Sequence, residues 1–183
     1  MSLGFYLKDN FPACLSFYVA NRKNLTSLHE YFQVLYSIIH NSFFNPHYTV
    51  VITDANIKNN IAMSILHIIS NCRDLSKKVH HAINVTITEA ELFFIGCGIS
   101  QACKISNTKK IFIVTNTIHI AKWIFDLSAH SFQIQSIKVV QCLMVFFNKD
   151  LSNTVKFWEC PSKLTWLLHI AVNKEMRQHK FVL

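Results

Sequence analysis

Glycine is the scarcest residue of note in this 183-residue sequence: only three occur, at positions 4, 96 and 98. A P-loop and a dinucleotide-binding loop each need several glycines between a strand and a helix, so both kinds of nucleotide site are excluded. There are ten histidines, yet they form neither an HExxH pair nor a zinc-finger spacing. The common zinc sites are therefore excluded as well.

Cysteine pairs and long apolar runs are also missing. The six cysteines show no CxxC motif and no regular spacing, a usage typical of reduced thiols inside a cell. The longest apolar stretches, 61–69 and 139–147, fall short of the ~18 residues that a membrane-spanning helix needs, and the stretch 11–20 makes a weak signal peptide. We therefore expect an intracellular protein, in the nucleus or the cytoplasm, with no membrane partner.

Acidic residues are few. Ten Asp and Glu stand against eighteen Lys and Arg, giving a formal charge of +8. Such an excess favours a polyanionic partner, nucleic acid before membrane, because the release of counterions drives association; ordinary basicity is the plainer alternative. With 51% hydrophobic residues, a chain of this length can bury one core, so we expect a folded domain rather than disorder.

Residues 1–46 differ in pattern from the rest. The segment 25–39 has apolar residues at helical spacing and predicts one amphipathic helix that ends before Asn45-Pro46, because proline disfavours helix in the residue before it. The aromatic face of this helix could pack on a domain further upstream or, equally well, on this same domain. We predict an N-terminal extension over 1–46 and one domain over 47–180.

From Tyr48 onward, β-branched runs alternate with helical patterns. The predicted strands cover 48–53, 61–69, 79–86, 110–115 and 155–159, with a turn over 56–60. The predicted helices cover 86–103, 117–126, 133–147 and 164–178. The order βββαβααβα predicts an α/β fold in which a mixed five-stranded sheet is flanked by helices.

The predicted helix over 86–103 has a well-marked start. Thr86 and Glu89 have the spacing of a capping box. Gly96 and Gly98 lie inside the helix, and each costs roughly 1 kcal/mol of helix propensity. We expect that close approach to a sheet compensates for them.

Two predicted strands end in similar polar residues: Asp54 follows the strand 48–53, and Asn116 follows the strand 110–115. The second strand is reached through a helix, so we expect the two to be parallel, joined by a right-handed crossover, with both side chains at the same end of the sheet. Glu91, one turn into that helix, can point towards the same end. Asp54, Glu91 and Asn116 are therefore candidate metal ligands.

Each candidate also has a purely structural explanation. Glu91 can be the acidic member of a second capping box with Thr88, although the box that starts at Thr86 leaves it free of that role. Asn116 is a good helix N-cap, and Asp54 can begin a turn. Spacing alone leaves these alternatives open.

Three segments together resemble type-1 ribonuclease H. Segment 52–58 (ITDANIK) is similar to the TDGS of the family's first strand, 88–92 (TEAEL) to the AEL of its first helix, and 113–119 (IVTNTIH) to the TDS of its fourth strand. The motifs occur in the family's order, and the resemblance runs over residues 48–177. It implies a ribonuclease H-like fold.

The last third of the chain resembles a particular version of that family. Segments 146–150 (FFNKD) and 157–162 (FWECPS) look like the version found in fungal non-LTR retrotransposon reverse transcriptases. Segment 168–174 (LHIAVNK) resembles the LHxxVDK that closes the family's domain. The loop histidine that assists product release in many members has no clear match, because Ser162-Lys163 occupies that loop and His169 lies on the helix.

The resemblance implies an endonuclease that cuts the RNA strand of an RNA–DNA hybrid. In this family four carboxylates hold two Mg²⁺ (or Mn²⁺) ions, which activate water and stabilise the leaving oxygen. Carried over, the four positions are Asp54, Glu91, Asn116 and Asn173. Two of them are amides, so the charge of the site falls from −4 to −2, and a hard cation such as Mg²⁺ should bind weakly.

Three hypotheses follow. The first is a retroelement-derived ribonuclease H whose degenerate active site leaves it weak or inactive. The second is a non-catalytic module that binds RNA–DNA hybrid or duplex RNA through its basic face. The third is a folded relic of a retroelement with no selected role.

Overall fold

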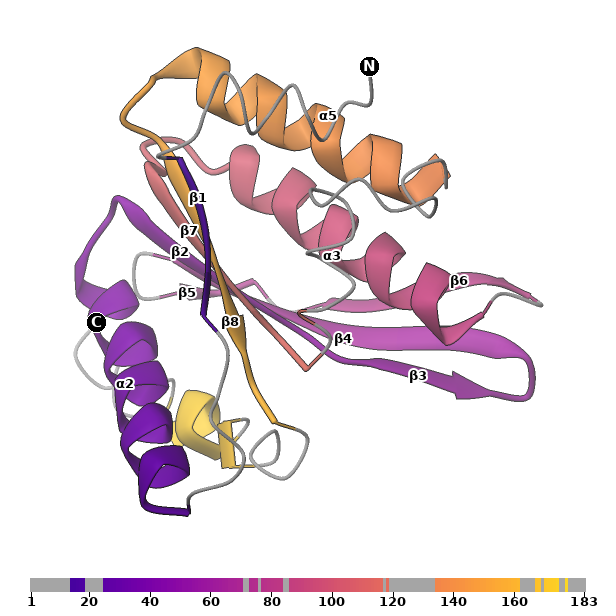
Figure 1. Ribbon diagram of the computed structural model, residues 1–183, viewed down its shortest axis with the longest axis horizontal. Helices are drawn as coiled ribbons and strands as arrows, with labels where there is room; N and C mark the ends of the chain where they lie inside the picture. Colours follow the sequence, from indigo (N-terminus) through magenta and orange to yellow (C-terminus); the bar gives the residue numbers. More distant parts are fainter. Residues whose placement is uncertain are drawn as a thin grey trace.

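The computed structural model describes residues 14–18, 25–70, 73–75, 77–83, 86–116, 118, 134–161, 167–168, 170–174 and 177. The elements are β1 Leu15–Tyr18, α2 Leu25–Phe44, β2 Tyr48–Thr53, β3 Ala55–Lys58, β4 Ile61–Ser70, β5 Arg73–Asp74, β6 Lys77–Ile83, α3 Ile87–Cys103, β7 Lys110–Thr115, α5 Ile134–Lys149 and β8 Thr154–Glu159 (Figure 1). Residues 167–168 and 170–174 are helical as well and form the C-terminal helical segment.

One mixed sheet organises these elements. Its strand order is β1-β8-β7-β2-β4-β3, and β5 and β6 also pair with β4. β2, β7 and β8 run parallel, whereas β4 runs antiparallel to β2, β3 and β6. The predicted α/β fold is confirmed: β2, β4, β6, β7 and β8 are the five expected strands, and β1, β3 and β5 add to them.

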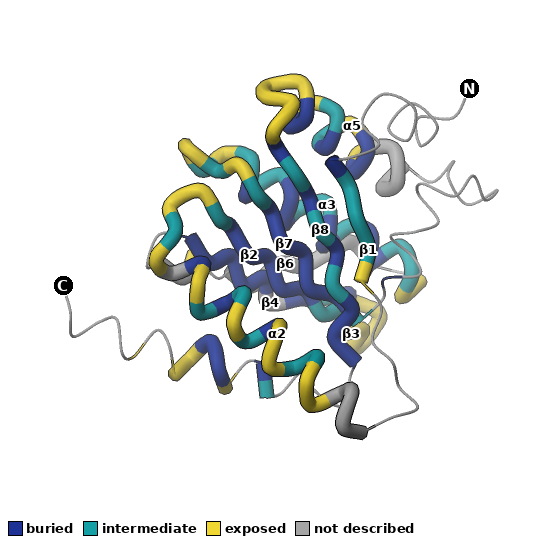
Figure 2. The backbone as a smooth tube through the Cα atoms, turned by 60° about the vertical axis from the view of Figure 1, so that its left-hand side comes forward, coloured by how far each residue is buried: buried dark blue, intermediate teal, exposed yellow. Residues whose placement is uncertain are grey.

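Helices cover both faces of the sheet (Figure 1). Because side chains alternate along a strand, Val51 of β2 packs with Ile95 of α3 and Phe147 of α5 on one face. Val50, the preceding residue, packs with Leu35 of α2 on the other face, where the C-terminal helical segment also lies. β2 and β7 are therefore buried along most of their length (Figure 2), as their continuous apolar runs predict.

The segment after β2 differs from the prediction. Residues 56–60 were expected to be a turn, but Ala55–Lys58 form β3, and only Asn59 and Asn60 make the turn. Both have positive φ, 52° and 61°, the conformation of a two-residue hairpin turn that asparagine tolerates. The register runs through without a shift, since Ile52 lies opposite His67 and Ala55 opposite Ser64. β2 and β3 thus form one long hairpin arm, interrupted only near Asp54.

The N-terminal region packs on this same domain, which is one of the two alternatives that the sequence left open. Helix α2 ends at Phe44, directly before Asn45-Pro46 as expected, and its Leu35 and Ile39 are fully buried against the sheet. The sequence did not predict β1, which pairs in parallel with β8 at the edge of the sheet. Phe17 of β1 stacks on Phe157 of β8 with ring centroids 5.2 Å apart.

Helix α3 begins and packs largely as expected. Thr86 caps it, and the reciprocal bonds of the capping box with Glu89 are both present. Gly98 lies against β2: a Cβ at this position would overlap the side chain of Val51. Gly96 instead faces Val139 of α5, where a Cβ would lie 3.3 Å from the nearest methyl group. The expected approach to the sheet is therefore correct for Gly98 and wrong for Gly96.

The remaining elements shift by a few residues. β6 begins at Lys77 rather than 79, and Thr86 is a helix cap rather than a strand residue. The predicted helix 117–126 lies outside the described residues except for Ile118, and the described part of 164–178 is helical. Within the described part of the chain, no helix has the length and apolar character needed to cross a membrane.

Candidate functional site

The candidate site lies at the carboxyl edge of the sheet, the end at which the parallel strands β2, β7 and β8 finish. Thr53 and Thr115, the last residues of β2 and β7, lie opposite each other. Asp54 and Asn116 follow directly, so both leave the sheet at the same end. The parallel arrangement that the sequence suggested is what brings them together.

Asp54 and Asn116 are in direct contact. The Asn116 Nδ2 group donates a hydrogen bond to Asp54 Oδ1 over 3.2 Å. Reversing the amide would set its oxygen against the carboxylate, so the amide nitrogen faces Asp54 and the oxygen faces away. The backbone N–H of Asp54 donates to Ser64 Oγ on β4 over 3.4 Å, which holds the hairpin arm in place at its interruption.

The other end of the Asn116 amide lacks a partner. Its Oδ1 atom is buried and accepts no hydrogen bond within the described structure. A buried acceptor without a donor costs roughly 1–3 kcal/mol and calls for a ligand, a water or an ion. Two other described side-chain atoms share this state, Thr154 Oγ1 and Trp158 Nε1; the Asn116 amide is also hydrogen-bonded to the carboxylate of Asp54. An oxygen in that position suits a hard cation.

Glu91 lies in the second turn of α3, the helix that starts at the carboxyl edge. It is buried, with 8% of its surface exposed. Its capping-box alternative is not used, because the box at the start of α3 consists of Thr86 and Glu89. Glu91 is therefore a buried carboxylate whose position the cap does not explain, and its role as a metal ligand stays a prediction.

Asn173 is the fourth predicted site residue. It lies exposed in the C-terminal helical segment. Leu168 and Val172 of that segment pack on the face of the sheet that α2 covers, opposite to the face that α3 covers. The structure brings Asp54 and Asn116 into contact, whereas a shared site that includes Asn173 stays a prediction.

Sequence reasoning missed a further carboxylate at this edge. Glu159 ends β8, lies opposite Thr115 of β7 and is buried, with 3% of its surface exposed. The signal was available, since Glu159 ends a predicted strand as Thr53 and Thr115 do. Even so, no three His, Cys, Asp or Glu side chains within the described residues are arranged to hold a metal ion.

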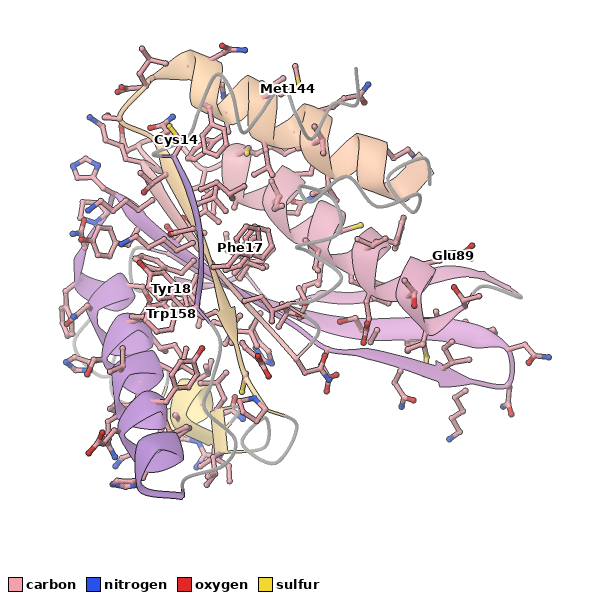
Figure 3. All side chains as sticks on the ribbon, viewed as in Figure 1. Cys14, Phe17, Tyr18, Glu89, Met144 and Trp158 are labelled. Carbon is pink, nitrogen blue, oxygen red and sulfur yellow. The ribbon has the colours of Figure 1, made fainter. Side chains whose placement is uncertain are left out.

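An aromatic cluster borders the same edge. Tyr18 of β1 stacks on Trp158 of β8 with centroids 4.2 Å apart (Figure 3), and Tyr31 of α2 contacts the same indole at 5.7 Å. The Tyr31 hydroxyl donates to the Tyr18 carbonyl oxygen over 3.1 Å. Burial and the nearby charge of Glu159 raise the pKa of Tyr31 well above its usual value. These contacts hold the edge strand β1 against β8 and α2.

Comparison with known proteins gives a fold but no family. No family model and no curated protein matches the sequence. The structure resembles ribonuclease H1 from the halophilic archaeon Halobacterium salinarum NRC-1, with a TM-score of 0.50 and 11% identity over 72% of this chain and 98% of that one. It also resembles LC11 ribonuclease H1, isolated from compost by a metagenomic approach, with a TM-score of 0.51 and 12% identity over 72% of this chain and 97% of that one.

A third similar structure is LC11 ribonuclease H1 in complex with an RNA/DNA hybrid, with a TM-score of 0.51 and 12% identity over 71% of this chain and 97% of that one. At such low identities the likeness defines the fold and no more. The chain has a ribonuclease H-like α/β fold.

Proposed function

We propose that this chain is a ribonuclease H-type endonuclease domain, derived from a retroelement, whose two-metal site is impaired. The observation that carries the proposal is the contact between Asp54 and Asn116 at adjacent carboxyl ends of parallel strands, with the outer oxygen of Asn116 buried and unpaired. This is where the sequence resemblance puts two of the four metal ligands. One of them has become an amide.

The substrate class follows from the fold and the charge. The similar LC11 enzyme is described in complex with an RNA/DNA hybrid, and the present chain carries a formal charge of +8. A basic surface favours a polyanion because counterion release drives binding. An RNA–DNA hybrid, or duplex RNA, is therefore the expected partner.

The donor set fits a divalent cation, but weakly. Asp54, Glu91, Asn116 and Asn173 would hold Mg²⁺ or Mn²⁺, which when bound would supply an activated water and stabilise the leaving oxygen. The unpaired Asn116 Oδ1 can accept a cation without giving up another bond. However, Asp54 and Glu91 are the only carboxylates among the four. Binding of Mg²⁺ depends on carboxylate charge, so we expect weak occupancy and low activity.

A second candidate function is non-catalytic binding of hybrid or duplex RNA. It is favoured by the hydrogen bond that Asn116 donates to Asp54. An aspartate at 116 would repel Asp54 unless a cation lay between them, whereas the amide stabilises the ionised Asp54 without any metal. The chain can therefore keep its fold and its basic surface after losing metal-dependent catalysis.

Cleavage and binding of a labelled RNA–DNA hybrid test both functions. With purified full-length chain, we expect binding without added metal and cleavage in Mn²⁺ or Mg²⁺ that is absent or orders of magnitude below that of LC11 ribonuclease H1. Asp54→Asn should abolish any residual cleavage, while Asp150→Asn, a matched change at the opposite end of the sheet, should not. A chain that fails to bind hybrid under any salt condition would exclude both functions and leave the folded relic.

A further inference from the structure

The amino edge of the sheet, where the parallel strands begin, is built from three loops: 45–47, 104–109 and 150–153. Backbone hydrogen bonds hold them side by side. The His47 carbonyl accepts from the N–H groups of Lys109 and Lys110 over 2.9 and 3.0 Å, and the Thr154 N–H donates to the Lys109 carbonyl over 2.9 Å. The His47 ring also contacts the Asn107 carbonyl at 3.0 Å. These loops therefore form one surface.

Lysines gather on this surface. Lys104, Lys109 and Lys149 are exposed, and Lys110 is half-buried with its ammonium 5.3 Å from the centre of the Tyr48 ring. The only carboxylate among the described residues of these loops is Asp150, whose Oδ2 lies 3.9 Å from the Lys109 ammonium. That pair is exposed on both sides, so it holds Lys109 only weakly.

Each of the lysines at the two helix ends acts on a thiol of the other helix. Burial raises the pKa of Cys103 in α3 to about 11, and Lys149 of α5 partly offsets this. Burial likewise raises the pKa of Cys142 in α5, and Lys104 after α3 partly offsets that. Each cation is thus near a thiol of the other helix, so the loops after α3 and α5 share one charged surface.

Helix dipoles explain some of these lysines but not all of them. Helices α2, α3 and α5 all end at the amino edge (Figure 1), and each C-terminus carries roughly half a negative charge. Lys104 and Lys149 complement those ends. Lys109 precedes β7 and Lys110 begins it. No helix dipole offsets their charge there, so the amino edge keeps an excess of positive charge.

An exposed aromatic side chain lies next to the first of these loops in the chain. Phe44, the last residue of α2, is 61% exposed and immediately precedes the first loop of the amino edge. Its ring contacts His40 at 5.2 Å, and His40 stacks on Tyr36 at 6.4 Å, which gives a ladder of rings along α2. Cations that follow a phosphate backbone, together with an exposed ring on which a base can stack, are the features of single-strand binding. A duplex keeps its base faces covered and would leave Phe44 unused.

We propose that the amino edge binds a single strand of RNA or DNA, with Lys104, Lys109 and Lys149 contacting phosphates and Phe44 stacking on a base. The strand β7 separates this surface from the candidate site by about 20 Å, since each residue of a strand advances about 3.3 Å. The two surfaces are independent. A strand held here requires neither metal nor the residues of the carboxyl edge.

The test is fluorescence anisotropy with a labelled single-stranded RNA or DNA of about 12 nucleotides, without divalent metal. Replacing Lys104, Lys109 and Lys149 together by Gln should weaken binding by at least tenfold at low salt. It should also reduce the slope of log affinity against log salt by about 2, since each phosphate contact on a single strand contributes about 0.7. Phe44→Leu, which keeps an apolar side chain, should weaken binding roughly fivefold or more without changing that slope.

A matched control replaces Lys58, Lys138 and Lys174 by Gln, which removes the same charge from exposed positions elsewhere. An equal loss in this control would show attraction by net charge alone and overturn the proposal. Binding to vesicles of phosphatidylserine and phosphatidylcholine in place of the oligonucleotide would also overturn the proposal, because the exposed Leu151 could insert into a membrane. Asp54→Asn should leave strand binding unchanged. Failure of the strand-binding proposal can therefore be distinguished from failure of the proposed nuclease function.

Discussion

Among the described residues, the two ends of one sheet carry opposite charge, and the helices account for only part of the difference. At the carboxyl edge α3 begins, and acidic residues near a helix start are favourable; Glu89 is the acidic member of the capping box there. At the amino edge α3 and α5 end, and Lys104 and Lys149 suit those ends. These charges would be expected in any protein with this fold.

The charges at the ends of strands differ from those at helix ends, because no helix dipole stabilises them. Asp54 follows β2 and the buried Glu159 ends β8, while Lys109 and Lys110 mark the start of β7. Carboxylates at a strand end cost desolvation unless something pairs with them. The fold does not require these strand-borne charges, so we interpret them as functional, and at the amino edge they act together with Lys104 and Lys149.

The largest expected effect comes from restoring the acidic charge of the carboxyl edge. Asn116→Asp together with Asn173→Asp should recover Mg²⁺ binding and raise hybrid cleavage by orders of magnitude, because two closely spaced cations need carboxylates to offset their charge. Either change alone should do much less, since groups that act as a unit are strongly non-additive. Cleavage assays and calorimetric Mg²⁺ titration measure both effects.

The same double variant should show linkage between metal and stability. Without metal, its melting temperature should fall below that of the parent because like charges are brought together, and Mg²⁺ should raise it again. Asn148→Asp, an exposed position at the end of α5, adds one charge away from the site and should show neither effect. A double variant that neither binds metal nor cleaves would mean that the loss of function extends beyond these two positions.

A smaller effect concerns the packing beneath the carboxyl edge. Gly98→Ala should destabilise the fold by about 1–3 kcal/mol, because its methyl group would overlap Val51 in a closely packed core. Gly96→Ala is the matched control: its methyl group would lie 3.3 Å from Val139, and the gain in helix propensity of roughly 1 kcal/mol offsets the crowding. Urea unfolding compares the two. Equal losses at both positions would contradict the close approach of α3 to β2.

The sequence predicted the fold well where the signals are local. β-branched runs located the five main strands, and the capping-box spacing located the start of α3. It missed β1, β3 and β5, which have two to four residues each, and the pairing of β1 depends on a distant partner. Tyr18 and Phe17 stabilise β1 by stacking on side chains of β8, which follows in the chain more than a hundred residues later. No local pattern carries that information.

The candidate site was predictable to the extent that topology determines it. Two strands joined by a helix had to be parallel, so the sequence alone could place Asp54 and Asn116 at one edge. The direction of the Asn116 amide could not be predicted, because it depends on the ionised Asp54 beside it. Glu159 was missed because the prediction rested on residues that follow the strands, whereas this carboxylate is the last residue within one.

A still smaller effect tests the start of α3, the helix that contains Glu91. Thr86→Ala should cost about 1 kcal/mol, because it removes the side-chain acceptor for the Glu89 N–H, now 3.2 Å away. Thr88→Ala should change the free energy of unfolding by less than about 0.5 kcal/mol, since Thr88 is not the cap. Thermal or urea unfolding distinguishes them. A larger loss at Thr88 would assign the cap to the second box.

The smallest expected effect is at alkaline pH and reports on the charge of Glu159. Burial, then Glu159, raise the pKa of Tyr31 above its unfolded value of 10.0. A raised pKa means that the folded state holds the proton more tightly, so the stabilisation is complete below pH 10.0 and is lost as the pH rises above it.

Tyr31→Phe should therefore reduce the loss of stability above that pH, although it also removes the hydrogen bond to the Tyr18 carbonyl. Glu159→Gln should reduce the same loss only in part, because burial is the larger cause. Urea unfolding at a series of pH values measures each slope, and an unchanged slope in Tyr31→Phe would mean that the phenol is not held as the structure shows.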